Sequence, residues 1–220
     1  MASFFNLTLD TTAPAGLTLK LNNGAIYATS TAVTATIDLT DGDTTGYQMK
    51  IWGVAGAETE AEAAWATFVK SKAITLTTGD GQKTVSIKVR DDVGNETATV
   101  TAKITLDTAV PVVTITGPDK SKISKVENFN VSAFSFSANA DFEEYKIKVV
   151  PSESSLENAG TQIPVTAGST NTSGTVGGYK KDTAINVTIN GADLEAASSG
   201  DGVKIVKVFV KNAAGTWSVA

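Results

Sequence analysis

The chain contains no cysteine and no histidine among its 220 residues. Without cysteine, no disulfide can cross-link the fold and no thiol chemistry is available. Without histidine, the chain lacks the commonest general base, the commonest transition-metal ligand and the usual partner of a serine nucleophile. No apolar run approaches the roughly 18 residues that a membrane span needs. These absences predict a protein that is neither an enzyme nor an integral membrane protein.

The chain also has little positive charge. The formal net charge is −5 and the sequence pI is about 4.8. Nucleic acids and anionic membrane surfaces both attract basic faces, so we expect neither as a partner. The first residues, MASFFNLTLDTTAPAG, have neither the basic nor the apolar region of a secretory signal. We therefore expect synthesis in the cytoplasm, with any exit by lysis or assembly.

An internal repeat is the most informative positive feature. Residues 79–97 read GDGQKTVSIKVRDDVGNET, and the residues from Gly200 onward read GDGVKIVKVFVKNAAGTWS. Alternating apolar residues in both copies predict a β-strand with one buried face. A second match joins LDTTAP at 9–14 to LDTAVP at 106–111. A unit of about a hundred residues is a domain, so we predict two tandem copies of one β-sandwich that join near Asp107–Pro111.

The repeat predicts an N-terminal arm at residues 1–10, a first domain at 11–108 and a second at 109–220. The second domain carries a long Ser/Thr/Gly-rich loop around 151–181. Glu58–Val69 is the one stretch with helical character, and we expect a short helix or turn there. The strands expected from alternation and turn signals are Leu17–Leu21, Ala32–Leu39, Tyr47–Trp52, Ala73–Thr77, Thr84–Arg90, Ala98–Leu106, Val113–Ile115, Ala133–Ala138, Tyr145–Val150, Ile185–Ile189 and Ile205–Val210.

The motifs LDTTAP, NNGAIY, YQMKIWG and GDGQKTVSIKVRDDVGN in the first domain resemble the bacterial immunoglobulin-like repeat. The resemblance covers nearly all of the first domain but only the ends of the second. It implies two immunoglobulin-like β-sandwiches, an all-β fold. Such repeats occur in bacterial cell-surface proteins and in structural proteins of tailed bacteriophages, where they act as spacers, adhesive modules or decorations. The resemblance implies no active site.

Two acidic clusters are candidates for a metal site. Asp41 with Asp43, and Asp91 with Asp92, Asn95 and Glu96, place oxygen ligands at turn spacing, which suits calcium. No run has the alternating spacing and closing glutamate of a calcium loop. The alternative is that these side chains cap turns, and we expect no cofactor.

Aromatic residues divide into two groups. Tyr47, Trp52, Trp65 and Phe68 are expected in the core of the first domain. Tyr179 and Trp217 lie near turns of the second domain, where exposed rings could stack on sugars. Packing in the core or along a sheet edge is the alternative for Tyr179 and Trp217.

The N-terminal arm carries a spare piece of strand. Ser3–Asp10 aligns with Val100–Asp107, the end of the last strand of the first domain, whereas the second domain has only Trp217–Ala220 after its Gly215 turn. We therefore predict an assembly arm, with Phe4, Phe5, Leu7 and Leu9 as its apolar contacts, that adds to a strand edge on another subunit. A frayed tail, or one folded back on the first domain, is the alternative.

Together these features predict a structural protein of a tailed-phage virion, a capsid or tail decoration whose partners are other virion proteins or copies of itself. Weak contact with cell-surface glycans is a further expectation. The alternative is a set of spacer or adhesive repeats on a bacterial cell surface.

Overall fold

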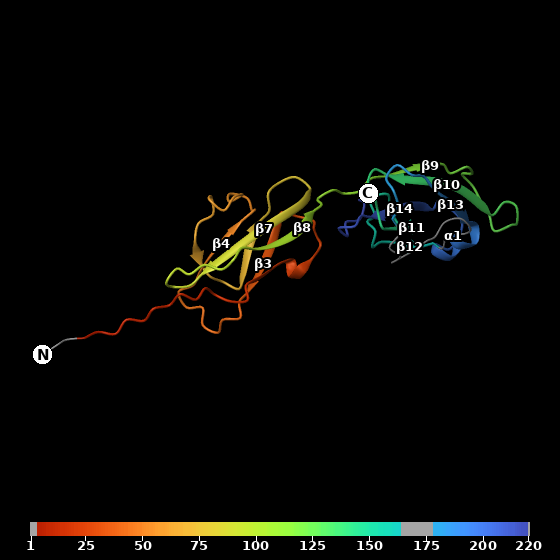
Figure 1. The fold of residues 1–220 in the computed structure, drawn as a ribbon. Helices are drawn as coiled ribbons and strands as arrows, with labels where there is room; N and C mark the ends of the chain where they lie inside the picture. The colour runs from red at the N-terminus through yellow and green to blue at the C-terminus, as the bar shows by residue number, and fades with distance from the viewer. Residues whose placement is uncertain (1–3, 164–177, 220) are drawn as a thin grey trace. The chain divides into compact units, whose positions relative to one another are not determined.

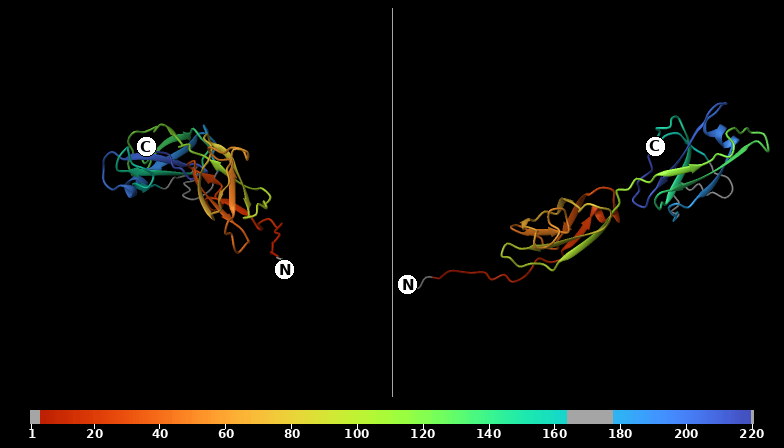
Figure 2. Two further views of the ribbon diagram at one scale, coloured as in Figure 1. Left: turned by 90° about the vertical axis from the view of Figure 1, so that its left-hand side faces the viewer. Right: turned by 90° about the horizontal axis from the view of Figure 1, so that it is seen from above.

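The computed structural model describes residues 4–163 and 178–219 (Figure 1). The chain divides into two compact units, Met1–Thr108 and Ala109–Ala220, within the junction at Asp107–Pro111. Figure 2 gives two further views of the same strands. No helix in the described part of the chain is long and apolar enough to cross a bilayer.

The first unit consists of two sheets. One has the order β1-β3-β6, formed by Thr18–Leu21, Ala32–Asp38 and Ser71–Thr75. The other has the order β2-β8-β7-β4-β5, formed by Tyr27–Ala28, Val100–Leu106, Gly81–Arg90, Gln48–Trp52 and Ala66–Thr67. A short 3₁₀ turn, η1, spans Asn22–Gly24. All pairs are antiparallel except β2 with β8, which is parallel.

The second unit repeats this plan with fewer strands. Its first sheet has the order β13-β10-β9, formed by Ile185–Asn190, Val131–Ala138 and Val113–Thr116. Its second has the order β12-β11-β14, formed by Thr161–Gln162, Glu144–Val150 and Ile205–Lys211. The helix α1, Gly191–Ala197, follows β13. The predicted fold class is confirmed: the chain is all-β, with two tandem immunoglobulin-like β-sandwiches.

Each unit has its own apolar core between its two sheets. In β7, Val85, Ile87 and Val89 are fully buried at alternate positions, as the sequence alternation predicts. The core of the second unit is richer in aromatic rings, with Phe136, Phe142 and Tyr145 all buried and packed together.

Glu58–Val69, expected as a short helix or turn, is a turn followed by the short strand β5, and the Glu62 carboxylate accepts a hydrogen bond from the Thr59 backbone N–H at 2.8 Å. The helix α1 was not expected from the sequence. The side chain of Asn190 caps that helix by accepting from the Ala192 backbone N–H at 2.9 Å.

The core prediction for the first-domain aromatics was correct only in part. Phe68 is buried and Tyr47 packs against the core. Trp52 and Trp65 are half-buried and lie outside it. The guanidinium carbon of Arg90 lies 4.4 Å from the centre of the Trp65 ring, so cation–π contact holds this ring on the outer face of the sheet.

A buried polar side chain organises the turn after the long central strand in each domain. Asp91, which is 5% exposed, accepts hydrogen bonds from the backbone N–H groups of Val93 and Asn95 and from the Asn95 side-chain amide. At the matching position, Asn212 accepts from the backbone N–H of Thr216. The same turn is thus built around the Asp91 carboxylate in the first domain and around the Asn212 amide in the second.

The Asp91 turn makes the stability of the first domain dependent on pH. Burial pushes the pKa of the Asp91 carboxyl upward, but the hydrogen bonds from Asn95, Val93 and Gly94 together outweigh it and lower the pKa below its usual range. A pKa that is lower in the folded than in the unfolded state stabilises the fold above the unfolded pKa of about 3.9, and this stabilisation is lost as the pH falls through the folded pKa.

We therefore predict that Asp91→Asn, which installs the residue type of the second domain, lowers the unfolding free energy of the first domain at pH 7. The difference from the wild type should shrink as the pH falls below about 4, because Asp91 then takes up a proton in the unfolded wild type and, at lower pH, in the folded domain as well. Denaturant unfolding followed by the fluorescence of Trp52 and Trp65 measures this. A difference that stays constant down to pH 2.5 would contradict the account.

Candidate functional site

The second domain has an open sheet edge where the first has a paired strand. In the first domain β7 lies between β4 and β8, and β2 flanks the far side of β8. In the second domain β14, the counterpart of β7, pairs with β11 along its whole length. On its other side the described residues provide only the bridge from Lys211 to Trp217 and the bond from the Ser218 N–H to the Val210 oxygen. In the first domain β8 occupies the matching side of β7.

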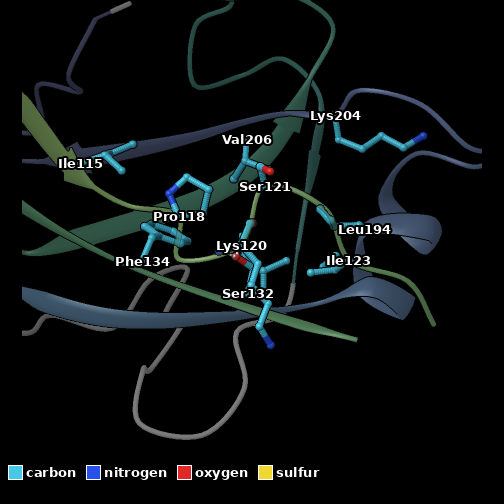
Figure 3. Close-up of a pocket in the computed structure, with 11 residues that line it drawn as sticks. Ile115, Pro118, Lys120, Ser121, Ile123, Ser132, Phe134, Leu194, Lys204 and Val206 are labelled. Carbon is cyan, nitrogen blue, oxygen red and sulfur yellow. Dashed lines mark hydrogen bonds between the residues drawn. The ribbon is translucent and has the colours of Figure 1, made fainter. Parts of the chain in front are cut away.

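A pocket of about 290 Å³ occupies the corresponding space (Figure 3). Ile115 of β9 and Val206 of β14 lie on two of its sides, and Pro118 and Ile123 come from the segment that follows β9. Asp119 and Lys120 of this segment are hydrogen-bonded to Ala133 and Ser132 of β10. The full lining is Ile115, Pro118, Lys120, Ser121, Ile123, Ser132, Phe134, Ile189, Leu194, Lys204 and Val206.

The pocket continues along β14. A second hollow of about 270 Å³ shares Ile115 and Val206 with the first and is lined mainly by apolar side chains, among them Val112, Val113 and Val208. The two hollows together form one apolar groove beside β14. We call it the β14 groove, bounded by Ile115, Pro118, Ile123 and Val206.

Apolar side chains near this edge differ in exposure between the two domains. Leu19 of β1 is 8% exposed, whereas Ile115 of β9 is 45% exposed. Val85 of β7 is fully buried, whereas Val206 of β14 is only half-buried. Val203, just before β14, is 96% exposed. Exposed apolar side chains beside an unpaired strand edge are the usual features of a site for strand addition.

Lysines often protect a sheet edge from pairing, because a charged ammonium resists burial. Here both lysines of this edge are tied to nearby backbone oxygens. Lys204 donates to the Gly200 oxygen at 2.7 Å, and Lys207 donates to the oxygens of Glu153 and Ser155 at 2.6 and 2.9 Å. The ammonium groups are therefore anchored to nearby turns, which leaves the apolar floor of the groove open.

The predicted assembly arm is exposed in this structure. Phe4, Phe5, Leu7 and Leu9 are 89, 85, 86 and 85% exposed, and residues 4–10 form no helix or strand. The arm is thus not folded back on the first domain, and in Figure 1 it leads as an extended trace up to the strands of that domain. Its role in assembly stays a prediction.

The two candidate glycan residues occupy different environments. Tyr179 is half-buried: its ring stacks on Phe142 at 4.8 Å and meets Tyr145 edge-on at 5.5 Å, so it belongs to the core of the second domain. Trp217 is half-buried at the sheet surface, with the ammonium groups of Lys146 and Lys211 at 4.2 and 5.3 Å from its ring centre.

The acidic clusters are used by turns. Asp41 accepts from the Ala15 backbone N–H at 3.1 Å, and Asp43 accepts from that of Thr45 at 2.9 Å. The Asp91 carboxylate accepts its hydrogen bonds from its own turn, as described above. Among residues 4–163 and 178–219, no group of three or more acidic side chains is placed to hold a metal ion. Part of the long loop predicted at 151–181 lies outside the described residues, so its predicted role is not addressed.

Neither a protein-family model nor a curated protein sequence matches the chain. Among solved structures, the fibronectin(III)-like modules of Clostridium thermocellum CbhA are similar over 92% of this chain and 90% of theirs, with 8% identity and a TM-score of 0.46. Bacillus thuringiensis chitinase ChiA74 matches 92% of this chain with 30% of its own length, at 14% identity and a TM-score of 0.32. Likeness at this level carries no functional information, and the assignment of the fold rests on the strand pairing.

The position of Tyr179 generates a stability prediction. We expect Tyr179→Ala to lower the unfolding free energy of the second domain by about 2–3 kcal/mol, because it removes a stacked ring from a partly buried site. Tyr179→Phe keeps the ring and should cost less than about 1 kcal/mol. Calorimetric unfolding of the two variants measures this. If Tyr179→Ala unfolds with the same free energy as the wild type, the ring does not stabilise the core and is again a candidate ligand contact.

Proposed function

We propose that this chain is a non-catalytic structural protein of a tailed-bacteriophage virion, a capsid or tail decoration that docks on the particle and projects an immunoglobulin-like domain. The observation that carries the proposal is the exposed apolar arm, Phe4–Leu9, attached to a body made of two β-sandwiches. Four large apolar side chains that are each at least 85% exposed gain free energy when a partner buries them.

The ionisable side chains support a passive role. The carboxylates with the clearest partners serve turns and ion pairs: Asp91 holds a turn, Glu60 pairs with Lys88 at 2.8 Å, and Glu144 pairs with Lys211. The chain holds no histidine or cysteine to supply a base or a nucleophile. The work of such a protein is done by its surfaces and its strand edges.

A second candidate function is that of spacer repeats in a bacterial cell-surface protein. The observation that favours it is the shared construction of the two domains, including a turn that fixes the segment entering each one. Asn95 donates to the Asp10 oxygen at 3.4 Å, and Asn212 donates to the Ala109 oxygen at 3.1 Å. Repetition of such an entry contact suits a string of similar modules. In either setting Trp217 is the remaining candidate for weak glycan contact.

Quantitative mass spectrometry of purified phage particles tests the proposal, with the cell-surface fraction of the same culture as the control. We expect peptides of this chain in the particles. Hundreds of copies per particle would indicate a capsid or tail-tube decoration, and a handful would indicate the neck or tail tip. Absence from particles, with peptides recovered from the cell surface, would overturn the virion role in favour of the spacer role.

A further inference from the structure

The five-stranded sheet of the first domain gathers cationic and aromatic side chains on its outer face. Because side chains alternate along a strand, the residues next to the buried positions point outward. On β4, β7 and β8 these outward positions carry four cations and one indole, and Trp65, just before β5, adds a second indole. Within these three fully described strands, no outward position holds a carboxylate. We call the set the cationic face: Lys50, Trp52, Trp65, Lys88, Arg90 and Lys103.

This positive charge is local, because the whole chain has a formal net charge of −5. The other sheet of the same domain differs: β1, β3 and β6 hold no aromatic residue, and the outward Lys20 of β1 is accompanied by the outward Asp38 of β3. Charge and rings are thus concentrated on one face of the domain.

The carboxylates near the cationic face are taken up by one lysine. Glu60 and Glu96 both contact Lys88, with oxygens 2.8 and 3.6 Å from its ammonium nitrogen. Among the residues that the structure describes, no carboxylate lies within ion-pair distance of Lys50 or Arg90. These two cations are therefore available to an anion from outside the chain.

The second domain neutralises the matching cations itself. The pairing registers of the two sheets match Lys50 with Lys146 and Arg90 with Lys211. Lys146 pairs with Glu157 at 3.0 Å, and Lys211 pairs with Glu144. The same two positions are thus compensated in one domain and uncompensated in the other.

The difference at Arg90 comes from a single side chain. Gln48 faces Arg90 as Glu144 faces Lys211. The Gln48 side-chain oxygen accepts two hydrogen bonds from the guanidinium, at 2.8 and 2.5 Å. The amide orients the guanidinium without cancelling its charge. A hollow of about 370 Å³ borders Gln48 and Arg90, and the exposed Asp92 also lines it, so this end of the face suits hydroxyl groups better than a carboxylate.

The rings of the face are partly accessible beside these cations. Trp52 and Trp65 are half-buried, and the Trp65 ring centre lies 4.4 Å from the Arg90 guanidinium carbon and 5.8 Å from the Lys50 ammonium nitrogen. Tyr27 of β2, 38% exposed, continues the face beyond β8. Rings with an apolar body and a polar surround suit ligands that are flat, hydrated and weakly apolar on one side, as sugar rings are.

We propose that the cationic face binds an acidic polysaccharide. Its sugar rings lie against the indoles of Trp52 and Trp65, and its carboxylates accept charge-assisted hydrogen bonds from Lys50 and Arg90. Neighbouring strands are about 4.8 Å apart, so the contacts spread across several sugar units of one chain. This assigns a second glycan site, on the first domain, beyond the contact proposed for Trp217, and it holds in either the virion or the cell-surface setting.

Tryptophan fluorescence tests the proposal on the full chain. The chain has three tryptophans, so Trp217→Phe leaves only the emission of the two on the cationic face. The probe is polygalacturonate, in which each sugar unit carries a carboxylate, and dextran is the uncharged comparison. We expect a saturable change in emission with polygalacturonate and none with dextran. Added salt should weaken the binding, because it screens the attraction between exposed charges.

Substitutions in the same background test the charges one at a time. Gln48→Glu gives Arg90 the carboxylate partner that Lys211 has in the second domain, and we expect it to weaken binding about tenfold. Lys50→Gln should have a similar effect. Lys20→Gln is the matched control: it removes the same charge from the outer face of the other sheet and should weaken binding less than about twofold. Denaturant unfolding checks that each variant remains folded.

Three results would overturn the proposal. The first is the lack of any response to polygalacturonate, or an equal response to dextran. The second is an equal effect of Lys50→Gln and Lys20→Gln, which would indicate attraction by charge without a defined site. The third is binding of poly-L-glutamate as tight as that of polygalacturonate, which would indicate an acidic protein as the partner. None of these results depends on the presence of the chain in virions, which mass spectrometry settles separately.

Discussion

Every β-strand has hydrogen-bonding groups on both of its sides, and the sandwich depends on how each side is satisfied. In the first domain β7 is paired on both sides, and Val85, Ile87 and Ile104 beneath β7 and β8 are buried. In the part of the second domain that the structure describes, β14 pairs with β11 along its whole length, and its other side meets only the Lys211–Trp217 bridge and the bond from the Ser218 N–H to the Val210 oxygen. The β14 groove lies beside that second side, where Val206 is half-buried and Ile115 is exposed.

The sequence predicted the strands well because alternation and glycine turns are local signals. The G-D-G turns are an example: Gly79, Gly81, Gly200 and Gly202 all have positive φ, as tight turns between strands require. Val85, Ile87 and Val89 alternate with polar residues in the sequence, and all three are fully buried.

The sequence left open the structure around residues whose environment is set by partners distant in sequence. Glu58–Val69 is rich in alanine and glutamate, which favour a helix locally. Its residues are instead fixed by Lys88, which binds Glu60, by Arg90, which stacks on Trp65, and by the core that takes Phe68. Tyr179 lies beside glycines in the sequence, and only the fold brings it against Phe142. No local pattern encodes these contacts. The groove itself could not be predicted in detail, because its walls come from five separate elements.

The turn after the long central strand is built around the Asp91 carboxylate in the first domain and around the Asn212 amide in the second. Only the carboxylate takes up a proton, so acid acts on this turn in one domain and leaves its counterpart unchanged. The two domains of one chain therefore respond differently to acid although they share one plan.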